Sequence, residues 1–75
     1  MSTVTEAVRE QLMATNEHYQ DLRKEHTRYA TELDKLASKI YLNEQERLEE
    51  VRLKKLKLRV KDEMEQLVQQ QSRTH

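Results

Sequence analysis

The feature that most restricts the fold is a stripe of side chains along the first half of the sequence, spaced four and three residues apart in strict alternation. The stripe comprises Val8, Leu12, Thr15, Tyr19, Leu22, His26, Tyr29, Leu33, Leu36 and Ile40. This spacing, kept for about four to five heptads, is typical of a helix that packs along a coiled-coil-like seam. Thr15 and His26 are its two weakly apolar positions. The stripe predicts one long helix from about residue 3 to about residue 38.

The composition also favours long helices. None of the 75 residues is Gly or Pro, the two residues that most weaken a helix interior and that most often form turns. Hydrophobic residues make up 35% and charged residues 37%, which is typical of exposed helices or coiled coils rather than of a globular core. The chain is therefore expected to be all-α, with very few turns.

Two helix starts have the form of a capping box, in which a cap side chain and the side chain three residues later each bond the other residue's backbone. The first is Thr3 to Glu6 and the second is Asn43 to Glu46. The second predicts a short connector at about residues 39–43 and a new helix from about residue 44 to 70, followed by a frayed tail at 71–75. Because no Gly marks the end of the first helix, one unbroken helix through the connector is the alternative.

The second helix is apolar on two sides. At about 100° per residue, Leu53, Leu56, Val60, Met64 and Leu67 share one face. The opposite face carries Leu48, Val51 and Leu58, a candidate interface between chains, although Leu48 and Val51 could instead contact the first helix near the turn. The seam within one chain is predicted to contain Leu12, Tyr19, Leu22, His26, Tyr29, Leu33, Leu36, Leu53, Leu56, Val60, Met64 and Leu67.

These expectations describe an antiparallel two-helix hairpin that assembles. A helix that is apolar on two sides needs two partners. The first helix, at roughly 50 Å, would also extend beyond the second, at roughly 40 Å, and leave its N-terminal turns without a partner. We therefore expect a homo-oligomeric helical bundle, with a dimer the simplest case.

The second half has a recognisable pattern. A Lys- and Leu-rich segment at residues 54–58 is followed by Lys61-Asp62-Glu63 and the apolar Met64, within the longer run LEEVRLKKLKLRVKDEME. This pattern, together with HYQDLRKEHTRYATELDKL in the first half, resembles the YdcH-like family of short bacterial proteins, a domain of unknown function. Val60 and Met64 stand where that family would have Leu and Ile. The resemblance implies a helical hairpin and brings no established activity.

Six basic residues lie close together in the second helix: Arg52, Lys54, Lys55, Lys57, Arg59 and Lys61. They form the alternative site, a surface for nucleic acid. Acidic residues precede and follow the run, no aromatic residue within it can stack on a base, and the chain has 14 basic and 14 acidic residues. A solvated helix face is therefore the favoured interpretation, and nucleic acid is not the favoured partner.

The sequence contains no pattern that favours catalysis. There is no Cys, and His18 and His26 lie two helical turns apart, roughly 12 Å, which is too far for one helix to chelate a metal. A two-helix protein also has no cleft that could raise the pKa of a carboxylate for acid–base work. We expect no enzyme activity, cofactor or metal. No apolar run approaches the roughly 20 residues of a membrane span, so a cytoplasmic protein that binds itself, or an unidentified protein partner, is expected.

Overall fold

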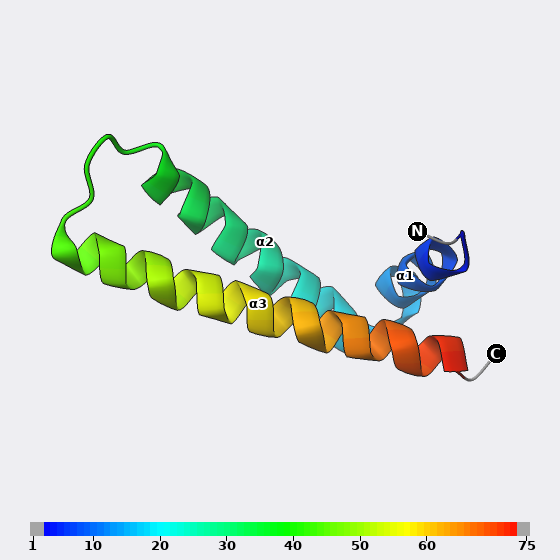
Figure 1. The fold of residues 1–75 in the computed structure, drawn as a ribbon. Coiled ribbons are helices and arrows are strands. Elements are labelled where there is room, and N and C mark those ends of the chain that lie inside the picture. Colours follow the sequence, from blue (N-terminus) through cyan, green and yellow to red (C-terminus); the bar gives the residue numbers. More distant parts are fainter. Residues whose placement is uncertain (1–2, 74–75) are drawn as a thin grey trace.

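The computed structural model describes residues 3–73, with side chains from residue 5. It contains three helices: α1 (Thr3–Thr15), α2 (Glu17–Ala37) and α3 (Glu44–Arg73). Figure 1 shows α2 and α3 lying side by side in opposite directions, while α1 leaves the plane of this pair and crosses the C-terminal half of α3. The all-α prediction is confirmed, but the two-helix hairpin is not, since three helices pack together.

The expected single helix at residues 3–38 ends at Thr15 and restarts at Glu17. Asn16 has an extended backbone, with φ −106° and ψ 108°, and its side-chain oxygen accepts a hydrogen bond of 2.8 Å from the backbone N–H of Tyr19. Asn is among the best N-cap residues because its carbonyl replaces a helical partner that the first turn lacks. Asn16 therefore begins a new helix in the middle of the stripe.

The end of α1 is stabilised by one side chain of α2 and by the backbone at the break. The amide of Gln20 donates a 2.7 Å bond to the carbonyl of Met13, one of the last carbonyls of α1. The backbone N–H of Asn16 still donates to the carbonyl of Leu12, at 2.8 Å. The break thus changes the chain direction while these polar groups keep their partners.

The expected first capping box at Thr3 involves a side chain outside the part of the chain that the structure describes. The second one is confirmed. The backbone N–H of Glu46 donates to the side chain of Asn43 at 2.7 Å, and the backbone N–H of Asn43 donates to the carboxylate of Glu46 at 3.1 Å. A salt bridge from Lys39 to the same carboxylate joins the connector to α3. The hydrogen bond from Lys39, followed by the one from Asn43, lowers the pKa of Glu46.

The connector occupies residues 38–43 and has no helix or strand. No residue between 3 and 73 has a positive φ, so the chain turns here without the left-handed conformation for which Gly is usually needed. Ile40, the last position of the stripe, is fully exposed in the connector and is not part of the seam. The stripe therefore ends at Leu36.

The core lies where α1 crosses the α2–α3 pair. Its buried members come from all three helices: Val8, Leu12, Tyr19, Leu22, Val60, Met64 and Val68, with Tyr29 and Leu67 packed at its edge. The expected overhang of the N-terminal turns is therefore wrong, because α1 folds back and buries Val8 and Leu12. The helical tail also differs from expectation, since residues 71–73, expected to be frayed, continue α3. None of the three helices, over residues 3–73, is long and apolar enough to cross a bilayer.

Candidate functional site

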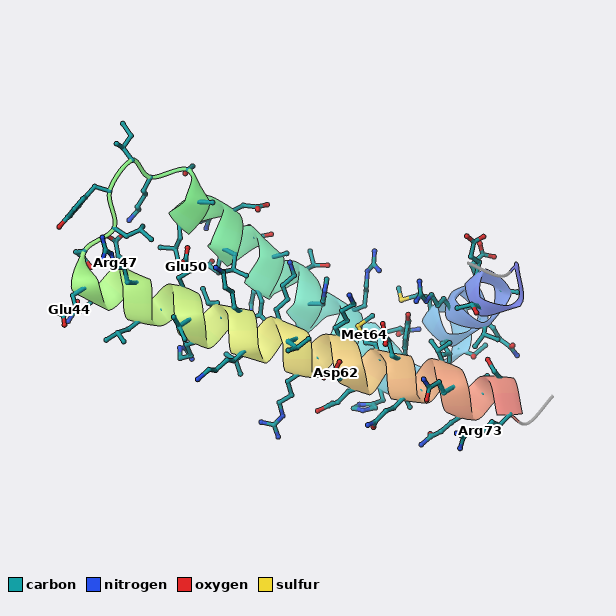
Figure 2. All side chains as sticks on the ribbon, viewed as in Figure 1. Glu44, Arg47, Glu50, Asp62, Met64 and Arg73 are labelled. Carbon is teal, nitrogen blue, oxygen red and sulfur yellow. The ribbon has the colours of Figure 1, made fainter. Side chains whose placement is uncertain are left out.

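The outer face of α3, defined here by Leu48, Val51 and Leu58, is the largest apolar feature that the fold leaves uncovered on that helix. These side chains are 66%, 49% and 59% exposed, respectively. At about 100° per residue they are turned by about 140–160° from the buried Leu53. Asp62 lies on the same outer face and points away from α2, whereas Met64 lies on the side that faces α2 (Figure 2).

The structure places the predicted seam residues on the inner sides of the helices. Six are buried: Leu12, Tyr19, Leu22, Leu53, Val60 and Met64. The other six are partly buried: His26, Tyr29, Leu33, Leu36, Leu56 and Leu67. They do not form one straight seam, because Leu12 belongs to α1 and the remaining first-half residues belong to α2. On α2 the burial decreases from Tyr19 and Leu22 toward the connector, whereas on α3 Leu53, the buried residue nearest the connector, is as deeply buried as Leu22.

Val68 is a core residue that the sequence analysis did not single out. It is buried, and it belongs to the cluster that contains Val8 and Leu12 of α1. Its spacing of four residues from Met64 is the signal that could have found it, since residues four apart share a helix face. The stripe of α3 ends instead at Leu67, which is only partly buried. The deeper burial of Val68 depends on α1 folding back across this end of α3.

The basic run lies entirely on α3, and half of it is paired with carboxylates of the same helix. Arg52 donates two hydrogen bonds to Glu49, at 3.1 and 2.6 Å, which lower the pKa of the Glu49 carboxyl. Lys54 lies 3.7 Å from Glu50, and Arg59 lies 3.9 Å from Glu63.

Neighbouring carboxylates thus neutralise half of the run. Of the other members, Lys57 and Lys61 lie one helical turn apart on the side of α3 near His26, whereas Lys55 is turned by about 120–160° from both. The six residues are therefore not one continuous cationic surface of the kind that follows a nucleic-acid backbone.

His26 is partly buried on α2. Its pKa is lowered, first because burial disfavours the charged ring and then because Lys57, Arg23 and Lys61 lie near it. The expected separation of His18 from His26 holds, and His18 is exposed. Among the residues that the structure describes, no group of three or more His, Cys, Asp or Glu side chains could hold a metal ion.

Comparison with known family models, with curated proteins and with solved structures finds no match to this chain. The resemblance to the YdcH-like family therefore stays an expectation from the sequence.

Proposed function

We propose that this protein is a non-enzymatic interaction module that binds a second copy of itself through the outer face of α3. The observation that supports the proposal is the exposure of three large aliphatic side chains on the side of α3 opposite the core. Burying each of them would contribute about 1.5–3 kcal/mol. In a two-fold symmetric dimer each contact occurs twice, once for each subunit. Isolated apolar side chains are common on protein surfaces, but three on one helix face form a stripe that a second helix can cover.

The test replaces two residues of the outer face by acids. Val51→Glu with Leu58→Glu would place four carboxylates in the contact of a dimer, and sedimentation should then show the mass of one chain where the wild type shows two. A control with the same charge change is Thr27→Glu with Thr31→Glu, at two exposed positions of α2, which should keep the wild-type mass.

Two outcomes would contradict the proposal. One is a wild-type chain that is monomeric at about 100 µM, well above the micromolar dissociation constant that about 8 kcal/mol of binding energy provides. The other is a folded monomer produced by Leu56→Glu with Val60→Glu, while the outer-face variant keeps its mass. That result would show that the assignment of the two faces is reversed.

A further inference from the structure

A cleft of about 160 Å³ lies where the three helices meet. Its apolar lining is formed by Tyr19 of α2 and by Met64 and Val68 of α3, which all belong to the core. A single water needs about 10–15 Å³ of such space, so the cleft has room for an anion of several heavy atoms.

The charged lining of the cleft is mostly basic. Arg9 of α1, Arg23 of α2 and Lys61 of α3 line it together with His26, against one carboxylate, that of Glu65. Each helix thus contributes one permanent cation. The chain as a whole has a formal net charge of zero, so the excess of positive charge at this point is local.

The pKa of His26 reflects the same local excess of positive charge. Burial is the first cause of its lowered pKa, and Lys57, Arg23 and Lys61 all lower it further. Neither Arg23 nor Lys61 forms an ion pair with another residue in the part of the chain between 5 and 73. Arg23 and Lys61 share the lining of the cleft with a single carboxylate, that of Glu65. The two cations repel each other, and a bound anion would reduce that repulsion.

We propose that this cleft binds a phosphate group, either inorganic phosphate or the phosphate of a small phosphomonoester, through Arg23 and Lys61 with Arg9 at its edge. Guanidinium groups donate paired hydrogen bonds to phosphate oxygens, and a Lys ammonium adds a compact charge. Because the three cations come from three helices, the bound anion would hold α1 against the α2–α3 pair. An anion that binds the folded chain but not the unfolded chain also stabilises the folded state.

The experiment follows the full chain by two-dimensional NMR during titration with inorganic phosphate and, separately, with glycerol phosphate, at constant ionic strength. At a pH of about 7.5 a phosphomonoester is doubly charged, since its second pKa is about 6. We expect saturable shifts at cleft residues of all three helices and a rise in the pKa of His26. A lower dissociation constant for glycerol phosphate than for inorganic phosphate would identify a phosphomonoester as the ligand. Equal dissociation constants would identify the free anion.

A variant and a matched control decide whether the cleft is responsible. Arg23→Gln with Lys61→Gln should weaken binding by about tenfold or more, because two charge contacts are lost. Lys24→Gln with Lys55→Gln removes the same charge from exposed positions outside the cleft and should leave binding unchanged. Equal weakening in both variants, or an absence of saturable shifts in the wild type, would overturn the proposal.

Discussion

The docking of α1 can be tested at Leu12, one of two buried α1 residues, with Val8, whose burial depends on the break at Asn16. Leu12 is 4% exposed, whereas its neighbour Met13 is 42% exposed. If the first 38 residues formed one straight helix, Leu12 would lie on the overhanging turns and would have no partner within the chain. Leu12→Ala therefore separates the three-helix fold from a simple hairpin.

The expected size of the effect follows from the burial. Truncating a buried Leu to Ala costs about 2–5 kcal/mol, and the lower part of this range applies where the surroundings can relax into the space. Because α1 contacts the rest of the chain on one side only, we expect a loss of about 2–3 kcal/mol. For a domain of this size such a loss lowers the midpoint of thermal unfolding by about 10–20 °C.

Circular dichroism melts of Leu12→Ala and Met13→Ala, each at two protein concentrations, provide the measurement. Met13→Ala should change the free energy of unfolding by less than about 0.5 kcal/mol, as is usual for surface positions. Two equal and small effects would refute the docking of α1. A loss for Leu12→Ala that grows on dilution would instead place Leu12 at a contact between chains.

Two further predictions concern single side chains. Asn16→Ala should lower the free energy of unfolding by about 1 kcal/mol through loss of the N-cap of α2, as measured in the same melts, with Asn43→Ala as the comparison at the other Asn cap. The lowered pKa of His26 means that the folded chain binds this proton more weakly than the unfolded chain, so stability should fall as pH drops below about 6.5, and not above it. His26→Leu should therefore lose less stability than the wild type between pH of about 7.5 and 5.5, and an equal loss in both would assign the effect to carboxylates.

The connector and the helix after it could be predicted from the sequence because the signals there are local. Asn43 and Glu46 lie in one turn, and their two hydrogen bonds involve only each other's side chains and backbone groups. The inner stripe of α3 follows from helical spacing in the same way. Such features depend on residues a few positions apart and do not require knowledge of the rest of the fold.

The break at Asn16 could not be read from the stripe, because the spacing of the stripe continues through it. The break at Asn16 neither adds a residue to the heptad spacing nor removes one, so the stripe keeps its alternation of four and three residues across it. The local signal was the pair Asn16-Glu17, which matches Asn43-Glu44 at the start of α3. Tyr19 stands where a capping box would have Glu or Gln, so the first of these caps lacks the reciprocal bond that marked the second.

The fold-back of α1 changes the physical reason for assembly. In a two-helix hairpin, the uncovered N-terminal turns would need a second chain, and folding and assembly would be inseparable. Here Val8 and Leu12 are buried within one chain, so the N-terminal turns do not need a second chain, and the outer face of α3 is the surface that we propose for pairing. Since Leu58 lies opposite the core, its substitution need not disturb α1 or α2, whereas Val51 also borders Leu36 of α2 in a cleft beside the connector. The outer-face variant should therefore yield a monomer that keeps most of the helix content of the wild type.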